Sequence, residues 1–162
     1  MLLSIANPSE NARSLILDTM DLTIHDVFLQ TDGQQFDRAS FDVGQRDPIL
    51  GAPLTIALKR GTRLVRIDYN TSTNAAALQW LEPQQTAGKN LPFMYTQSQT
   101  VYARSWIPLQ DSPQVRVTYD ARIKTPSGLL AVMSADDNDH TTRSGTYTFK
   151  MTRPIPSYLI AL

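Results

Sequence analysis

Residue types that could carry out catalysis are sparse in this chain and are not grouped along it. Its two histidines, His25 and His140, lie far apart, and the sequence contains no His-Glu-x-x-His motif. A catalytic zinc site of the usual kind needs two histidines and a carboxylate around one metal ion. We therefore expect no complete zinc site within these residues, and we interpret each histidine as structural or solvated.

Other common catalytic and ligand-binding patterns are also missing from the sequence. No serine lies in a Gly-x-Ser-x-Gly elbow, and the few glycines form no phosphate-binding loop. The acidic run Asp136–Asp139 lacks the glycine and the terminal glutamate of an EF-hand loop, so we interpret it as a polar hairpin tip. No motif of this chain therefore supports a serine hydrolase, a nucleotide-binding protein or a calcium-binding protein.

One polar segment remains as a candidate binding site. Gln97-Ser98-Gln99 lies between Tyr95 and Tyr102, so side-chain amides and aromatic rings follow one another closely. An amide donates and accepts hydrogen bonds but carries no charge. By itself the segment predicts a polar loop, and a functional role for it depends on the surrounding sequence.

The surrounding sequence has a specific pattern. Residues 76–89 read AALQWLEPQQTAGK, residues 92–99 read PFMYTQSQ, and residues 104–113 read RSWIPLQDSP. Together with NARSLILDT at 11–19 and IPSYLIAL at 155–162, these runs resemble the amino-terminal domain of the zinc aminopeptidases of the gluzincin superfamily. The pattern is most similar to the branch of leukotriene A(4) hydrolase and aminopeptidase B. The resemblance covers nearly the whole chain.

The resemblance implies both a fold and a site. The fold would be a saddle-like, sandwich-like domain of antiparallel or mixed β-sheet. The segment around Gln99 would reach into the active-site cleft and contact the free amino end of the substrate, where the wider aminopeptidase group has a glutamate. A side-chain carbonyl can accept a hydrogen bond from an α-ammonium group, and such a bond contributes about 1.5–3 kcal/mol. The substrate-binding candidates are Gln97, Ser98, Gln99 and Tyr102, with no catalytic and no metal-binding residue among them.

The resemblance also implies what lies outside this chain. In the parent enzyme, zinc would be held by a separate catalytic domain, and the partners would be that domain and the amino terminus of a peptide. The chain alone would bind no cofactor and would be inactive, and whether the parent also hydrolyses an epoxide is left open. Two alternatives are a non-catalytic β-sandwich module that binds carbohydrate or protein, and a domain that only shields the cleft.

The elements that position the candidate segment follow from the alternation of apolar and polar residues. This period of two is typical of half-buried strands. The clearest case is 114–124, where five apolar residues alternate with charged and polar ones, and the runs 63–69, 147–151 and 22–30 behave similarly. We therefore predict an all-β fold. Ten prolines, several of them within 77–113, favour a long structured excursion there.

Turn residues predict how these strands are joined. Asp32-Gly33 predicts a hairpin between 22–30 and 36–43, and Lys59–Thr62 predicts one between 54–58 and 63–69. Thr125–Gly128 separates 114–124 from a further strand at 129–135. Because Leu129–Met133 is apolar without alternation, we predict that this strand is covered on both faces.

Bulk composition limits the partners and the compartment. Fifteen basic and fifteen acidic residues cancel, so we expect no nucleic-acid partner. The sequence has no signal peptide and no apolar run of bilayer length, so we expect no membrane partner. Without cysteine the localisation stays unknown, with the cytoplasm favoured.

The length fits one β domain, residues 1–162. We expect this domain to be truncated at both ends, because Leu159–Leu162 is apolar with no polar tail.

Overall fold

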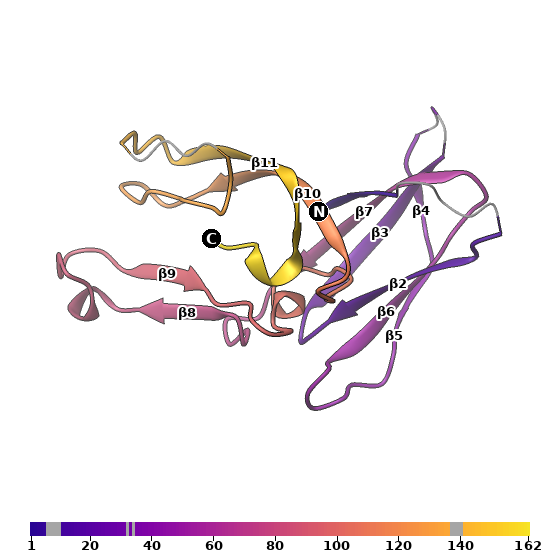
Figure 1. Cartoon of the computed structure of the whole chain (residues 1–162), viewed down its shortest axis with the longest axis horizontal. Coiled ribbons are helices and arrows are strands. Elements are labelled where there is room, and N and C mark those ends of the chain that lie inside the picture. Colours follow the sequence, from indigo (N-terminus) through magenta and orange to yellow (C-terminus); the bar gives the residue numbers. More distant parts are fainter. Residues whose placement is uncertain (6–10, 32, 34, 137–140) are drawn as a thin grey trace. The chain divides into compact units, whose positions relative to one another are not determined.

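The computed structural model describes residues 1–5, 11–31, 33, 35–136 and 141–162. Their regular structure is almost entirely β-strand, arranged in four sheets whose paired strands are all antiparallel (Figure 1). This confirms the predicted all-β fold. No helix in this described part is long and apolar enough to cross a membrane.

The chain divides into two compact units. Unit 1 comprises Met1–Ala75 and Arg104–Gln110, and unit 2 comprises Ala76–Ala103 and Asp111–Leu162. The described residues also form three short 3-10 helices: η1 (Pro83–Gln85), η2 (Ala103–Ser105) and η3 (Ser157–Leu159).

Unit 1 contains two antiparallel sheets. The first has the order β1-β7-β3-β4, formed by β1 (Leu2–Ser4), β7 (Thr62–Asn70), β3 (Thr23–Thr31) and β4 (Asp37–Arg38). The second has the order β2-β6-β5, formed by β2 (Ser14–Thr19), β6 (Ala52–Ala57) and β5 (Phe41–Val43).

The hydrophobic core of unit 1 is made by the alternate residues of these strands. Because successive side chains point to opposite faces, every second residue of a strand reaches the same core. Burial of each large aliphatic side chain contributes about 1.5–3 kcal/mol. The buried cluster consists of Leu17, Val27, Leu29, Leu54, Ile56, Val65 and Ile67.

Unit 2 is built from two β-ribbons, each a pair of antiparallel strands. β8 (Leu78–Leu81) pairs with β9 (Phe93–Thr96), with Leu78 opposite Thr96. β10 (Arg116–Lys124) pairs with β11 (Thr146–Pro156), with a register shift between Val117 and Tyr119. The strict alternation of burial along β10 confirms the clearest strand predicted from the sequence.

One of the predicted hairpins is wrong, and the other forms only in part. β6 pairs with β2 and β5, while β7 pairs with β1 and β3, so the turn at Lys59–Thr62 connects two sheets. β3 pairs with only the two residues of β4, and β5 joins the other sheet. The chain changes sheet at both places because both sheets bury a face in one core. Asp32 of the predicted turn lies outside the described residues.

The strand predicted at 129–135 is not formed. These residues have no regular structure, and Val132 is 41% exposed although Ala131 and Met133 are buried. The backbone N–H of Ser134 donates to the Ala161 carbonyl at 3.1 Å, which ties the end of the segment to the carboxyl-terminal residues. The segment is therefore apolar and anchored, but the predicted cover on both faces is not present.

Candidate functional site

The candidate segment Gln97–Tyr102 follows β9 directly and is fixed by backbone hydrogen bonds in unit 2. The Gln97 N–H donates to the Ala77 carbonyl at 2.8 Å, which extends the pairing of β8 with β9. The Tyr102 N–H donates to the Ser98 carbonyl at 3.0 Å and closes a turn, after which η2 begins. The segment is thus a short turn held at the end of a ribbon.

The four candidate side chains differ in exposure. Gln97, Gln99 and Tyr102 are exposed, whereas Ser98 is only 2% exposed. The side-chain Oε1 of Gln97 accepts a hydrogen bond from the Gln99 N–H at 3.3 Å, so that carbonyl is used within the turn. The structure therefore brings Gln97 and Gln99 together on one exposed turn. The burial of Ser98 favours a packing role for its side chain over contact with a ligand.

The chemistry available at this turn is hydrogen bonding. Amides accept and donate hydrogen bonds, but they are neither general bases nor nucleophiles at neutral pH. Across the described residues, no group of three or more His, Cys, Asp or Glu side chains could hold a metal ion. His25 is exposed on β3, and His140 lies with Asp137–Asp139 outside the described residues. The turn can recognise a ligand, and bond cleavage would need groups from elsewhere.

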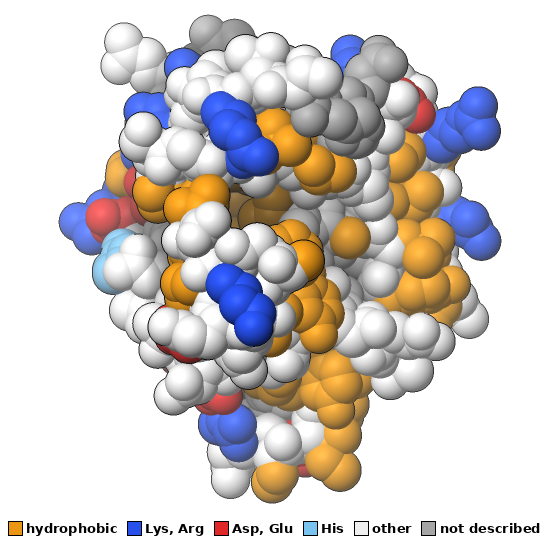
Figure 2. Space-filling model, turned by 90° about the vertical axis from the view of Figure 1, so that its left-hand side faces the viewer, with side chains coloured by type: hydrophobic (Ala, Val, Ile, Leu, Met, Phe, Trp, Pro, Cys, Tyr) orange, Lys and Arg blue, Asp and Glu red, His pale blue; other side chains and the backbone are white. Residues whose placement is uncertain are grey.

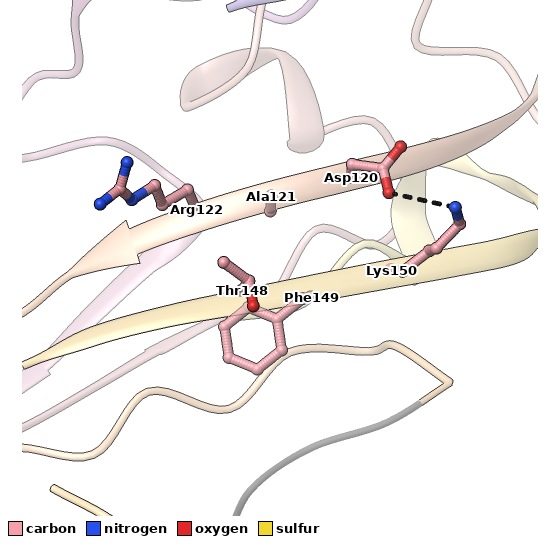
Figure 3. Close-up of a pocket in the computed structure, with 6 residues that line it drawn as sticks. All are labelled: Asp120, Ala121, Arg122, Thr148, Phe149 and Lys150. Carbon is pink, nitrogen blue, oxygen red and sulfur yellow. Dashed lines mark ion pairs between the residues drawn. The ribbon is translucent and has the colours of Figure 1, made fainter. Parts of the chain in front are cut away.

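A hollow lies on the β10–β11 ribbon, but its chemistry is that of a strand surface (Figure 3). Asp120 and Lys150 are opposite one another in register, with Nζ and Oδ1 3.8 Å apart and both side chains largely exposed. An exposed ion pair of this kind contributes little to stability and leaves the carboxylate solvated. We do not interpret this hollow as an active site.

Arg104 anchors the chain immediately after the candidate segment. Its guanidinium is almost fully buried, donates to the Leu50 carbonyl at 2.7 Å and lies 3.6 Å from the Asp18 carboxylate, all within unit 1. The Arg104 carbonyl accepts a hydrogen bond from the Met20 N–H at 2.9 Å. The sequence pattern predicts no role for Arg104 in the candidate site, although this residue stands at the start of the 104–113 motif.

Asp111 and Ser157 form a buried polar pair within unit 2. The Ser157 hydroxyl donates to the Asp111 carboxylate at 2.5 Å, and each residue is 3% exposed. A charge-assisted hydrogen bond in a buried position is strong. This pair joins two of the sequence motifs, 104–113 and 155–162, so the motif residues serve partly to hold unit 2 together.

Comparison with known proteins assigns the family. Residues 3–159 match the model of the Peptidase M1 N-terminal domain. Leukotriene A-4 hydrolase from Xenopus laevis is 42% identical over 99% of this chain and 27% of its own length. Leucine aminopeptidase 2 from Yarrowia lipolytica is 39% identical over 99% of this chain and 24% of its own length. The chain therefore belongs to the Peptidase M1 N-terminal domain family.

Solved structures agree with this assignment. The structure of yeast LTA4 hydrolase in complex with bestatin superposes with a TM-score of 0.81 and 31% identity, over 99% of this chain and 24% of that one. An M1 zinc metallopeptidase from Deinococcus radiodurans shares the fold, with a TM-score of 0.62 and 22% identity over 92% of this chain and 33% of that one. The chain spans about a quarter of the length of the curated relatives it matches.

Proposed function

We propose that this chain is the amino-terminal β domain of a zinc aminopeptidase of the leukotriene A-4 hydrolase type, and that it recognises the free amino group of the substrate. Gln99 is the residue that makes the contact. The observation that carries this proposal is the exposure of the Gln99 side chain on an anchored turn within the PFMYTQSQ motif. The family name and the names of the relatives support an aminopeptidase as the parent protein.

The roles of the two glutamines differ in this proposal. Gln99 accepts a hydrogen bond from the substrate α-ammonium through its side-chain carbonyl, a charge-assisted bond that contributes about 1.5–3 kcal/mol. Gln97 is a positioning residue, because its Oε1 already accepts the N–H of Gln99 at 3.3 Å. Tyr102 lies on the same turn and lines the entrance for the substrate, while Ser98 supports the turn from within.

Cleavage of the peptide bond belongs to another part of the longer protein. We infer that the catalytic domain would hold a zinc ion, which when bound would supply an activated water, since M1 zinc metallopeptidases share this fold. In this proposal the chain contributes binding and orientation of the substrate. Its partners would be the catalytic domain and the amino terminus of a peptide. Membership of this family argues against the alternative of an unrelated carbohydrate-binding sandwich.

The test is a substitution at Gln99 in the full-length enzyme, assayed on two substrates. One substrate is an amino-acid amide with a free α-amine, and the other carries a blocked amine. We expect Gln99→Ala to lower kcat/KM on the free amine by roughly tenfold to one-hundredfold, which corresponds to the loss of one charge-assisted bond. The blocked substrate cannot offer that bond, so its slower hydrolysis should change little.

A matched control separates recognition from folding. Gln114 is another exposed glutamine of unit 2, remote in sequence from the turn, so Gln114→Ala should leave both substrates unaffected. An unchanged kcat/KM for Gln99→Ala on the free-amine substrate would refute the assignment. It would favour a domain that shields the cleft without touching the substrate.

A further inference from the structure

The β8–β9 ribbon carries exposed aromatic rings on one of its two faces. Side chains of directly opposed residues lie on the same face, and those of successive residues alternate between the faces. The register pairs Gln79 with Tyr95 and Leu81 with Phe93, which places these four side chains together. Gln97 continues the same face, because its N–H extends the pairing of the two strands by one position. We call these five residues the aromatic face.

The two rings of the aromatic face are exposed and stacked on each other. Phe93 is 54% and Tyr95 is 41% exposed, and their ring centroids lie 5.8 Å apart with an angle of 27° between the ring planes. Each ring limits the rotation of the other before any ligand binds. A ligand that contacts this pair therefore immobilises side chains that have already lost part of their rotational freedom, which lowers the entropic cost of binding.

The opposite face of the same ribbon is less exposed. Its residues Leu78, Met94 and Thr96 are half-buried, and Trp80 is exposed at 59%. Figure 2 views the molecule from the side on which the ribbon tips lie in Figure 1, and it shows hydrophobic side chains exposed at this end. A single exposed apolar residue is common on protein surfaces, whereas adjacent exposed aromatic residues are typical of a surface that binds a ligand or a partner.

The side chains of the aromatic face favour an uncharged aromatic group. None of the five carries a charge at neutral pH. Aromatic rings attract other rings in offset-stacked or edge-to-face arrangements. The side-chain amides of Gln79 and Gln97 can exchange hydrogen bonds with a peptide backbone. An aspartate or glutamate would lose hydration on this face without gaining an opposite charge. The aromatic face therefore fits an aromatic side chain of an extended peptide.

The aromatic face leads directly to the candidate turn. Gln97 is the last residue of the face, and its Oε1 accepts a hydrogen bond from the Gln99 N–H at 3.3 Å. An extended chain rises about 3.3 Å per residue, so Tyr95 lies at most about 13 Å from Gln99 along the backbone. An extended peptide whose amino group is bound at Gln99 covers that distance within about five residues. Side chains near its third to fifth residues can therefore reach the aromatic face.

We propose that the aromatic face is a subsite for peptide substrates, which binds an aromatic side chain at the third, fourth or fifth residue from the amino terminus. This inference rests on the proposed function, in which Gln99 binds the α-amine of the same peptide. Phe93 and Tyr95 are then specificity-determining residues. They contact the substrate away from the bond that is cleaved, and they raise the affinity of the enzyme for one class of peptide.

A peptide series assayed on the full-length enzyme tests the subsite. Each peptide begins with leucine followed by glycines and carries phenylalanine, glycine or aspartate at one of the three positions, and release of leucine gives kcat/KM. We expect the best phenylalanine peptide to exceed its glycine counterpart by about twofold to tenfold, the effect of one aromatic pair, and aspartate to fall below glycine. Phe93→Ala and Tyr95→Ala should each bring the phenylalanine-to-glycine ratio close to one. Trp80→Ala is the matched control on the opposite face and should preserve the ratio.

The ratio is measured within each variant, so a general loss of activity cancels, and Tyr95→Leu is a second variant that keeps an apolar side chain. Three results would overturn the proposal. They are a ratio of one in the unmodified enzyme, an unchanged ratio in both Phe93→Ala and Tyr95→Ala, and an equal fall of the ratio in Trp80→Ala. The Gln99→Ala test compares free and blocked amines, whereas this one compares phenylalanine with glycine, so the two failures are distinguishable.

Discussion

Alanine substitutions at Gly51 and Gly61 compare a crowded position with an open one in unit 1. The difference in their free energies of unfolding shows how closely the Asp47–Gly51 loop is packed. Both have a positive φ, +75° at Gly51 and +79° at Gly61, so alanine is strained at either position. The two positions differ in the room that they leave for a Cβ atom. A Cβ on Gly51 would lie 2.0 Å from the Thr19 carbonyl oxygen, whereas a Cβ on Gly61 would have no atom within 4 Å.

The expected cost of each substitution follows from this difference. The positive φ alone costs about 1 kcal/mol for alanine, which is the whole effect expected for Gly61→Ala. At Gly51 the backbone must also move by roughly 1 Å to relieve the clash. Gly51 exchanges two backbone hydrogen bonds with Asp47, of 2.7 and 3.0 Å, and this movement would break both. With about 1 kcal/mol for each bond, Gly51→Ala should cost about 3 kcal/mol in total.

Urea denaturation is the assay for this comparison. With a slope of about 2 kcal/mol per molar urea, the midpoint for Gly51→Ala should lie roughly 1 M below that for Gly61→Ala. Circular dichroism of the native states checks that both variants still fold. Equal midpoints for the two variants would refute the reasoning, since they would mean that the loop adjusts without losing its hydrogen bonds.

Two further predictions concern titration and activity. Burial raises the pKa of Tyr69 to about 12, and its hydroxyl donates to the Trp106 carbonyl, so ultraviolet titration should show one of the six tyrosines ionising near pH 12 and Tyr69→Phe should remove that step. Because the folded pKa lies above the unfolded value of about 10, the contribution of Tyr69 to stability is complete below pH 10 and is lost as the pH rises through 12. The 162-residue chain should show neither bound zinc nor aminopeptidase turnover on a fluorogenic amino-acid amide, with or without added zinc. Stoichiometric zinc together with turnover would reveal a metal site missed in both sequence and structure.

Local sequence patterns predicted the strands better than their pairing. The alternation in 63–69, 114–124 and 147–151 corresponds to β7, β10 and β11, because period-two burial is a property of each strand alone. The hairpin predicted around Lys59–Thr62 failed, since a turn reverses the chain without choosing its neighbour. Pairing was decided by the shared core of the two sheets of unit 1. The prediction of a single domain truncated at both ends stays a prediction.

The candidate site was likewise predicted only in part from the sequence. Its location at 97–102 came from the resemblance of the motifs, whereas the burial of Ser98 and the Gln97–Gln99 hydrogen bond appear only in the folded chain. Whether Gln99 contacts a substrate remains a prediction for the full-length enzyme.

The sequence by itself determined the all-β class, the family and the positions of the long strands, because alternation and motif order are written along the chain. Tertiary structure alone decided which strands became neighbours and how Arg104 and Asp111 are buried. These features depend on contacts between residues far apart in sequence. Such contacts form where apolar faces meet and buried polar groups find partners, and no local pattern encodes that meeting.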